Sequence, residues 1–348
     1  MPLGFHVEHA AAWLVPSVSA RPFHVGSGQL SLVAAVRPSD ARHTRSSGRT
    51  PTDLGRPGLE SGGEVANTEE AGQGAVIAVA NQKGGVGKTT TAVSLSAALA
   101  HTGAQVLLVD LDPQANASSG LGCRPEQDQA TTYHVLSGAA DAASAIVATP
   151  VDNLSLLPSS IDLAGAEIEL VSALSREQIL RRILEPLRAH TQLLIIDCPP
   201  SLGLLTVNGL TAADGVIVPI QCEYYALEGL EALRRNVELV RASLNPDLEI
   251  LGFALTMLDG RTRLSQQVVE EVRLHFGEKV FNTRIPRSVR IAEAPGFGQP
   301  ITSFDPGSRG AVAYRRLAGE VLNRLNPQAA PSNHREDTTT PRGTRSTA

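Results

Sequence analysis

Five short apolar runs recur along the middle of the chain and predict buried β-strands. They occupy residues 75–80, 105–110, 192–197, 215–220 and 250–257, and each is continuous and rich in Val, Ile or Leu. A strand covered on one face alternates apolar and polar residues, whereas a strand covered on both faces is apolar throughout. The runs therefore predict a parallel sheet with helices on both of its faces.

Helical patterns lie between these runs. Over residues 225–241 apolar residues recur at spacings of three and four among Glu and Arg, namely Leu227, Leu230, Leu233, Val237 and Val240. That spacing places one apolar stripe on an otherwise solvated helix. Strands that alternate with helices predict a doubly wound α/β fold with a mostly parallel sheet and right-handed crossovers.

The two ends of the chain lack such patterns. Residues 1–72 are rich in Ser, Gly, Pro, Arg and His without a sustained period, and residues 327–348 form a polar tail. Segments of this kind do not bury enough apolar surface to fold. We therefore expect a disordered N-terminal extension over 1–72, one α/β domain over 73–326, and a disordered C-terminal tail over 327–348.

Composition narrows the class of protein. Apolar residues make up 42% of the chain and aromatic residues only 3%, so the core is expected to be aliphatic. A net charge of −5 argues against coating nucleic acid with the whole surface, so any DNA contact needs a local patch. Cys123, Cys198 and Cys222 lack the spacing of a metal site and fit a reducing cytoplasm. No apolar run reaches the roughly 18 residues that a membrane span requires.

A glycine-rich turn, NQKGGVGKTT, follows the first predicted strand and precedes a predicted helix. This is the context of a phosphate-binding loop, in which backbone N–H groups and the helix N-terminus surround an anion. In such a loop Lys88 reaches the β- and γ-phosphates, and the Thr89 hydroxyl ligates Mg²⁺. We expect nucleotide contacts from Lys83, Gly84, Gly85, Val86, Gly87, Lys88, Thr89 and Thr90.

The turn departs from the common phosphate-loop pattern, because Gln82 stands at its first glycine and Lys83 follows. With this second lysine, KGGVGKTT resembles the deviant Walker A motif of the ParA/MinD family of ATPases. The resemblance implies that Lys83 crosses a dimer interface to the phosphates of the partner's ATP. It therefore implies an ATP-dependent homodimer, which the spacing of the residues alone does not show.

Two predicted strand ends support the resemblance. Asp112 stands two residues past Asp110, and Asp197 ends the run over 192–197. Ligands of open α/β sheets bind at the carboxyl ends of the strands. The resemblance implies that Asp112 positions or activates the attacking water, that Lys83 and Lys88 act with it in catalysis, and that Asp197 and Thr89 hold Mg²⁺.

The C-terminal half resembles the chromosomal ParA/Soj branch of this family. The segment IPRSVRIAEAPGFGQPI is similar to that branch's adenine-side loop, so the resemblance implies that Pro286 and Ser288 contact adenine or ribose. Arginines recur through this half, and the resemblance implies that Arg261, Arg287 and Arg290 contact DNA phosphates without sequence preference. The alternative for these arginines is a solvated helical face.

The resemblance implies a partition ATPase of the cytoplasm and nucleoid. Such a protein dimerises with ATP and Mg²⁺, binds double-stranded DNA non-specifically, and hydrolyses ATP when a ParB-type centromere-binding protein stimulates it. The alternative is a MinD-like ATPase that positions cell division at the membrane surface. That role needs a C-terminal basic amphipathic helix, whereas residues after Leu325 are rich in Pro, Thr and Ser, so no membrane partner is expected.

Two further classes within the superfamily fit less well. An iron–sulfur reductase of the nitrogenase type needs a cysteine pair that bridges a dimer, and the three cysteines do not resemble that arrangement. A polysaccharide-secretion or flagellar ATPase is disfavoured by the resemblance of the C-terminal half.

Two interpretations of residues 1–72 stay open. Arginines and histidines outnumber acidic residues up to Arg56, which suits a flexible arm that contacts DNA or the partner. Alternatively, the segment is translated from DNA upstream of the true start, and the repeated Phe-His-Val at 5–7 and 23–25 reflects a CACGTG palindrome like that at the centre of ParB sites. Because the segment precedes the first core strand, we expect its deletion to leave folding and basal ATPase activity intact.

Overall fold

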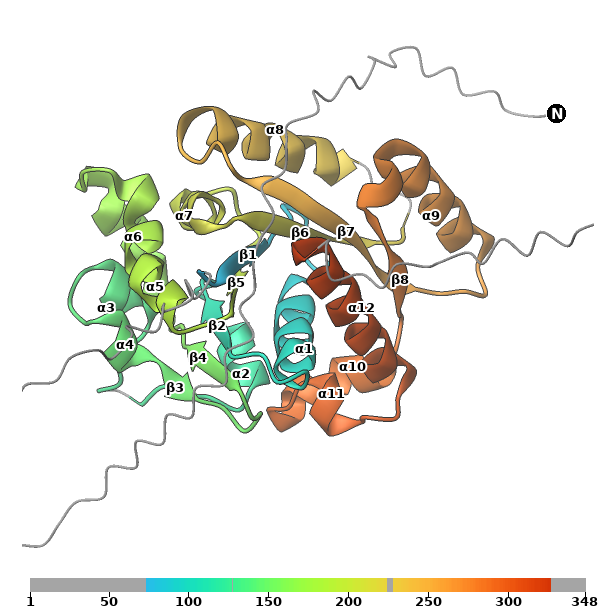
Figure 1. Ribbon diagram of the computed structural model, residues 1–348, viewed down its shortest axis with the longest axis horizontal. Helices are drawn as coiled ribbons and strands as arrows, with labels where there is room; N and C mark the ends of the chain where they lie inside the picture. The colour runs from blue at the N-terminus through green and yellow to red at the C-terminus, as the bar shows by residue number, and fades with distance from the viewer. Residues whose placement is uncertain (1–72, 127, 224–227, 327–348) are drawn as a thin grey trace, which may run out of the picture.

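The computed structural model describes residues 73–126, 128–223 and 228–326 (Figure 1). Both predicted tails and Leu227 lie outside these ranges. The centre of the fold is an eight-stranded sheet in the order β3-β4-β2-β5-β1-β6-β7-β8. The strands are β1 (Ala75–Val79), β2 (Val106–Asp110), β3 (Val147–Ala148), β4 (Leu154–Leu157), β5 (Leu193–Asp197), β6 (Gly215–Gln221), β7 (Glu249–Leu258) and β8 (Val280–Pro286).

All neighbouring strands are parallel except β3 and β4, so the predicted mostly parallel sheet is confirmed. The five predicted strands correspond to β1, β2, β5, β6 and β7. Three strands were not predicted. β3 and β4 have two and four residues, and β8 carries exposed Asn282 and Arg284 at the sheet edge, so none forms a long apolar run.

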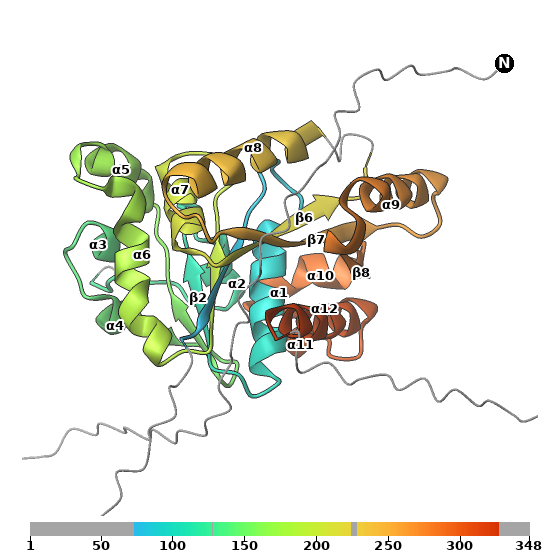
Figure 2. The same cartoon turned by 45° about the horizontal axis from the view of Figure 1, so that its top comes forward.

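Helices cover both faces of the sheet (Figures 1 and 2). One face is covered by α1 (Lys88–Ala100), α2 (Asn116–Gly120), α10 (Val289–Glu293), α11 (Ile301–Phe304) and α12 (Arg309–Leu325). The other is covered by α3 (Thr132–Leu136), α4 (Ala142–Ala145), α5 (Leu163–Glu169), α6 (Ile179–Leu184), α7 (Leu204–Ala212), α8 (Glu228–Ser243) and α9 (Arg263–Phe276). Short 3₁₀ turns are η1 (Leu170–Ser172), η2 (Arg176–Gln178), η3 (Glu185–Ala189), η4 (Gly277–Lys279) and η5 (Ala294–Phe297).

The two faces bury two separate hydrophobic clusters. Along β1, Val76 and Ala78 point into one cluster, whereas Ala75, Ile77 and Val79 point into the other. Since every residue of β1 is buried on one side or the other, the strand has to be apolar throughout. In α8 the predicted stripe is buried at Leu230, Leu233, Val237 and Val240. No helix in the described ranges is long and apolar enough to cross a membrane.

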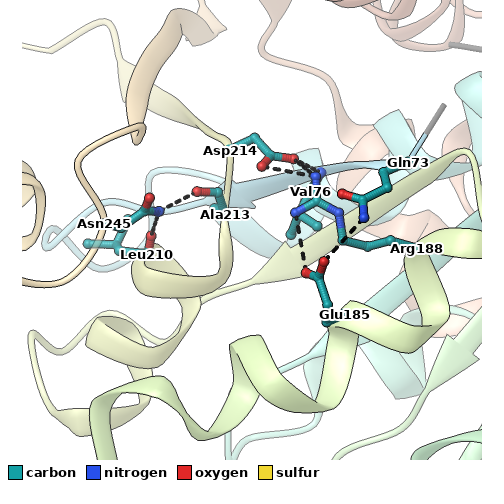
Figure 3. Close-up of polar contacts among 8 residues, drawn as sticks. All are labelled: Gln73, Val76, Glu185, Arg188, Leu210, Ala213, Asp214 and Asn245. Carbon is teal, nitrogen blue, oxygen red and sulfur yellow. Dashed lines mark hydrogen bonds and ion pairs between the residues drawn. The ribbon is translucent and has the colours of Figure 1, made fainter. Parts of the chain in front are cut away.

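Polar contacts fix the start of β1 at the amino edge of the sheet (Figure 3). The Asp214 carboxylate accepts hydrogen bonds from the Val76 N–H at 2.8 Å and from Arg188 Nη2 at 2.9 Å. Burial raises the pKa of Asp214, and the bonds from Val76 and Arg188 oppose that rise. Nearby, the buried Asn245 amide donates to the carbonyls of Leu210 and Ala213 at the end of α7. The bond between Asp214 and Val76 holds the start of β1 next to the start of β6.

Arg324 joins the end of α12 to β7 and β8. Its guanidinium donates to the carbonyl oxygens of Leu251 at 2.6 Å and Lys279 at 3.0 Å, and it lies 3.9 Å from the centre of the Phe281 ring. Gly252 makes room for this side chain, because a Cβ there would lie 2.2 Å from Arg324 Nη1 and 2.6 Å from the Phe281 ring.

We expect Gly252→Ala to destabilise the fold by about 1–3 kcal/mol, because the added methyl group overpacks a buried ring and displaces Arg324. Thermal and urea unfolding measure the change. The matched control is Gly319→Ala in the middle of α12, where a Cβ meets nothing within 4 Å. Removing a helical glycine there should stabilise the protein by about 0.5–1 kcal/mol. Similar destabilisation by both substitutions would refute the packing argument.

Candidate functional site

The phosphate-loop sequence connects β1 to α1 at the carboxyl edge of the sheet. Gly85 and Gly87 have φ angles of +74° and +87°, a left-handed conformation that favours glycine. At Gly84 and Gly85 a Cβ would meet nothing within 4 Å, so the loop borders open space there. The loop therefore presents its backbone, and α1 begins directly behind it at Lys88. This is the local structure that the sequence predicts for binding phosphate.

Hydrogen bonds to two other strands, β6 and β7, hold the loop in place. The buried Asn81 amide donates to the Pro219 carbonyl of β6 at 2.7 Å, and its Oδ1 accepts from the Lys83 N–H at 3.1 Å. The buried Thr256 hydroxyl of β7 donates to the Val86 carbonyl at 2.8 Å. Sequence reasoning did not single out Asn81 or Thr256, because their partners are distant along the chain.

The two lysines of the loop have different surroundings. Lys88 is 7% exposed, and its ammonium donates to the Lys83 carbonyl at 3.2 Å. Burial lowers the pKa of Lys88, while the charges of Asp197 and Asp112 oppose this effect. Lys83 is half-buried, and its ammonium has no hydrogen bond or ion pair to any residue that the structure describes. Lys88 is thus held inside the loop, whereas the Lys83 ammonium has no partner among the described residues.

Asp110 and Asp197 lie side by side at the ends of β2 and β5, where they are partners in the parallel register. Both are fully buried. Burial raises the pKa of Asp197 well above its usual range, and the nearby Asp110 raises it further. The Thr89 hydroxyl and Lys88 lower this pKa, yet neither Asp197 oxygen accepts a hydrogen bond of normal geometry from the part of the chain that the structure describes. A buried carboxylate without a partner is costly, so this position suits a bound cation.

Unlike Asp197, the Asp110 carboxylate accepts hydrogen bonds from neighbouring residues within the described structure. Its Oδ2 accepts from the N–H and the hydroxyl of Ser118 at 2.8 and 2.7 Å, and its Oδ1 accepts from the Asp112 N–H at 3.2 Å. Burial nevertheless raises the pKa of Asp110 to about 6, with these hydrogen bonds opposing the rise. Asp110 therefore fixes the loop that carries Asp112, by accepting hydrogen bonds from its main chain.

Asp112 is held through both its main-chain carbonyl and its side chain. Its carbonyl accepts from the Ser159 hydroxyl at 2.8 Å, and its own Oδ1 accepts from the Gln114 N–H at 2.9 Å. Ser159 follows β4, a strand that was not predicted, so no sequence signal pointed to it. Three residues further, Ala115 has a φ of +51°, which is strained for a residue with a Cβ.

A cavity of about 280 Å³ opens beside Thr89 and Thr90. It lies between α1, α2 and the segment that runs from α10 to α11, and Ser94, Asn116, Ser119 and Gln299 contribute polar groups to its lining. Pro286 and Ser288 do not line it. Pro286 ends β8 in register with Leu258, and Ser288 is the N-cap residue of α10.

The three predicted DNA-contacting arginines are all exposed, but they differ in their partners. Arg261 forms an ion pair with Asp259 at 2.8 Å. Arg290 pairs with Glu293 and Asp305, each at 3.0 Å, and lies 4.5 Å from the centre of the Phe304 ring. The Arg287 side chain forms no hydrogen bond or ion pair within the described ranges. Hydrogen bonds from Arg261 lower the pKa of Asp259, and the charge of Arg287 adds a smaller contribution.

The fold and this edge of the sheet define a nucleoside triphosphatase of the phosphate-loop class. A family model described as an AAA domain matches residues 74–250. The chain is 56% identical over 248 residues to the sporulation initiation inhibitor protein Soj of Bacillus subtilis, covering 71% of this chain and 98% of that protein. It is 53% identical over 257 residues to the chromosome partitioning protein ParA of Caulobacter vibrioides, covering 73% and 96%. The chain therefore belongs to the ParA/Soj family of chromosome-partitioning ATPases.

Solved structures agree with the fold. A cobyrinic acid a,c-diamide synthase of Mycobacterium smegmatis with bound ADP and magnesium has a TM-score of 0.64 and 43% identity, covering 72% of this chain and 94% of that one. The cell division ATPase MinD of Pyrococcus furiosus has a TM-score of 0.61 and 30% identity, covering 72% and 99%.

We expect Thr256→Val to weaken the phosphate loop, because it leaves the Val86 carbonyl buried without its donor, at a cost of about 1–3 kcal/mol. Thermal unfolding and nucleotide titration measure the effect. The control is Thr211→Val in α7, where the buried hydroxyl has no partner in the described structure and its loss should be nearly neutral. Equal nucleotide affinity in the two variants would remove the role assigned to Thr256.

Proposed function

We propose that this chain is a partition ATPase that binds ATP and Mg²⁺, dimerises around the nucleotide, and binds DNA without sequence preference. It would act on the nucleoid with a ParB-type centromere-binding protein. The observation that supports this proposal best is the difference between the two loop lysines. Lys88 serves its own loop, whereas Lys83 has a positive charge without a partner in the described part of the chain.

The residues present fit a Mg²⁺–ATP complex. The loop from Lys83 to Thr90 offers backbone N–H groups and Lys88 to the phosphates. The Thr89 hydroxyl and the unpaired Asp197 carboxylate are hard oxygen donors of the kind Mg²⁺ prefers. When bound, Mg²⁺ would neutralise charge on the phosphate oxygens during transfer. The cavity beside Thr89 and Thr90 leaves room next to the phosphate loop.

We propose that Asp112 orients the attacking water. Its loop lies at the same edge as the phosphate loop, and bonds to Asp110 and Ser159 fix its main chain. Asp112 is 6% exposed, so a water molecule beside it would be shielded from bulk solvent. In this proposal Asp112 acts on the water, Lys88 on the bound phosphates, and Lys83 on the phosphates of the second subunit.

The DNA-binding role rests on the exposed arginines near β8 and α10. Ion pairs already neutralise much of the charge of Arg261 and Arg290, so each must exchange a carboxylate for a phosphate. Arg287 needs no such exchange. We therefore propose Arg287 as the strongest DNA contact of the three, with Arg261 and Arg290 contributing when their acidic partners are displaced.

A MinD-like role at the membrane surface is the alternative. The MinD structure is similar in fold, but the identity to the partition proteins is higher by more than 20 percentage points. Lipid flotation and DNA co-sedimentation, each with ATP, separate the two roles.

We expect Lys83→Ala to bind ATP with nearly normal affinity but to dimerise and hydrolyse poorly, because its charge acts on the partner's nucleotide. Lys88→Ala should instead abolish nucleotide binding, because it removes the charge held inside the loop. Nucleotide titration, size-exclusion chromatography with ATP and phosphate release report these steps separately. Normal turnover by the Lys83→Ala variant would refute the cross-dimer role.

We expect Arg287→Ala to weaken binding to any duplex DNA and to lower the salt slope of binding by about one per lost phosphate contact. ATP-dependent dimerisation should not change. Arg241→Ala is the matched control, because Arg241 is exposed on α8, on the other face of the sheet (Figure 1). If both variants keep the salt slope of DNA binding of the unaltered protein, Arg287 does not contact DNA and lies on a solvated face.

A further inference from the structure

The loop that carries Asp112 contains a strained residue. Ala115, the N-cap residue of α2, has a φ of +51° and a ψ of +34°, a left-handed conformation that is unfavourable for a residue with a Cβ. Its N–H donates to the Asp112 carbonyl at 2.9 Å, so the strain lies in the turn that closes this loop. A strained backbone persists only where the surrounding structure fixes it from several sides. The loop after β2 therefore depends on contacts with other segments.

One such contact comes from Ser159, which follows β4. Its hydroxyl donates to the Asp112 carbonyl at 2.8 Å, and its N–H donates to the Ser118 hydroxyl at 3.0 Å. The Ser118 hydroxyl and N–H both donate to Asp110 Oδ2, at 2.7 and 2.8 Å. These bonds connect the end of β2, the loop that carries Asp112 and the first turn of α2 to the segment after β4.

A second contact comes from Thr132 in the first turn of α3. Its hydroxyl proton is shared between the carbonyl oxygens of Asp110 and Pro158, at 2.9 and 3.0 Å. Its N–H also donates to the Pro158 carbonyl, at 2.8 Å. Thr132 therefore joins the end of β2 to the segment after β4 at a second point.

We call Ser118, Thr132 and Ser159 the hydroxyl clamp. All three are buried, with 1%, 0% and 0% of their surface exposed. A buried hydroxyl is costly unless it is hydrogen-bonded, and each of these hydroxyls donates to Asp110 or Asp112. None of the three lies in the phosphate loop or lines the cavity beside it. Their hydrogen bonds therefore fix the loop that carries Asp112.

The clamp also helps to determine which oxygen of Asp112 is free. Oδ1 accepts from the Gln114 N–H at 2.9 Å, whereas Oδ2 accepts no hydrogen bond from the residues that the structure describes. Because Ser159 fixes the Asp112 carbonyl and the Gln114 N–H fixes Oδ1, the loop sets the direction of Oδ2. Oδ2 is thus the oxygen available to a water molecule.

We propose that the hydroxyl clamp positions Asp112 for ATP hydrolysis, so that Ser118, Thr132 and Ser159 are positioning residues that act through Asp112. When a clamp hydroxyl is removed, the loop relaxes from the strain at Ala115, and Asp112 Oδ2 moves away from the attacking water. This inference rests on the proposed ATPase function, because it assigns the residues that support the water-positioning carboxylate of that site.

The phosphate loop has a separate support. Asn81 bonds to β6, and Thr256 of β7 bonds to the Val86 carbonyl, whereas the clamp holds the ends of β2 and β4 on the other side of β1 in the sheet order. Phosphate binding and water positioning therefore depend on different side chains. Loss of a clamp hydroxyl should lower kcat and leave nucleotide affinity unchanged, whereas Thr256→Val should lower nucleotide affinity.

The test uses the full chain. Thr132→Val keeps the shape of the side chain and removes its hydroxyl, Thr132→Ser keeps the hydroxyl, and Ser159→Ala removes the bond to the Asp112 carbonyl. The matched control is Ser160→Ala, because the Ser160 hydroxyl contacts only Asp162 at 3.2 Å and Thr131 at 3.4 Å among the described residues. Phosphate release at varied ATP concentration gives kcat and KM, and ADP titration gives nucleotide affinity independently of hydrolysis.

We expect Thr132→Val and Ser159→Ala to lower kcat about tenfold while KM and ADP affinity stay within about twofold of the unaltered protein. Thr132→Ser should restore most of kcat, and Ser160→Ala should not change it. A Thr132→Val or Ser159→Ala protein that does not bind ADP has not folded. Ser159→Cys then takes its place, because it exchanges the hydroxyl for a weakly donating thiol of similar shape, and the same decrease in kcat is expected.

Unchanged kcat in the variants that lack a clamp hydroxyl would overturn the proposal. A loss of ADP affinity as large as the loss of kcat would also overturn it, as would a Thr132→Ser variant as slow as Thr132→Val, because the role of these residues would then be structural only. Asp112→Asn separates this inference from the proposed function. Normal hydrolysis by Asp112→Asn refutes the proposed role of Asp112, whereas slow hydrolysis by Asp112→Asn with normal clamp variants refutes the positioning role alone.

Discussion

The register of the central strands is the constraint on which the site depends. Val79 pairs with Asp197, and Asp197 pairs with Asp110, so three strands end at the same height. The loops after β1 and β2 carry the candidate phosphate-binding glycines and the candidate water-positioning carboxylate, and β5 ends at the candidate metal ligand Asp197. A shift of one residue in either pairing would bury a carboxylate in the apolar layer or withdraw it from the loop. The contact of Asp214 with Val76 at the opposite edge helps to prevent such a shift.

The buried charges of this arrangement cost free energy in the absence of ligands, and the same charges favour ligand binding. Among the described residues, none donates a hydrogen bond of normal geometry to the fully buried Asp197 carboxylate, and Lys88 is desolvated at the same edge. These costs fall when ligands supply the missing charges, so part of the free energy of nucleotide binding would come from relieving them. The candidate site therefore suits a negatively charged ligand together with a cation.

The sequence alone predicts much of the fold, because long strands buried on both faces leave continuous apolar runs. It misses β3, β4 and β8, whose residues are few or alternate with polar ones. The glycine loop was equally visible, since its residues are consecutive. The side chains that hold the site were not, because Asn81, Thr256 and Ser159 contact groups far away in sequence. The sequence shows the arginines and the acidic residues of this region. It does not show that Arg261 and Arg290 pair with carboxylates, because pairing depends on the fold.

The three cysteines offer an experimental consequence of the fold. Cys198 and Cys222 are buried, and burial raises the pKa of both thiols, that of Cys222 to about 11. Burial also raises the pKa of Cys123, but this residue is only half-buried. It follows Gly122, whose backbone lies next to Gly298 where the α2 side meets the segment after η5. A maleimide dye would therefore react first with Cys123 in the native protein, without any engineered residue. Its fluorescence would report the separation of these two segments, and so follow in real time any opening of the cavity as ligands arrive and leave.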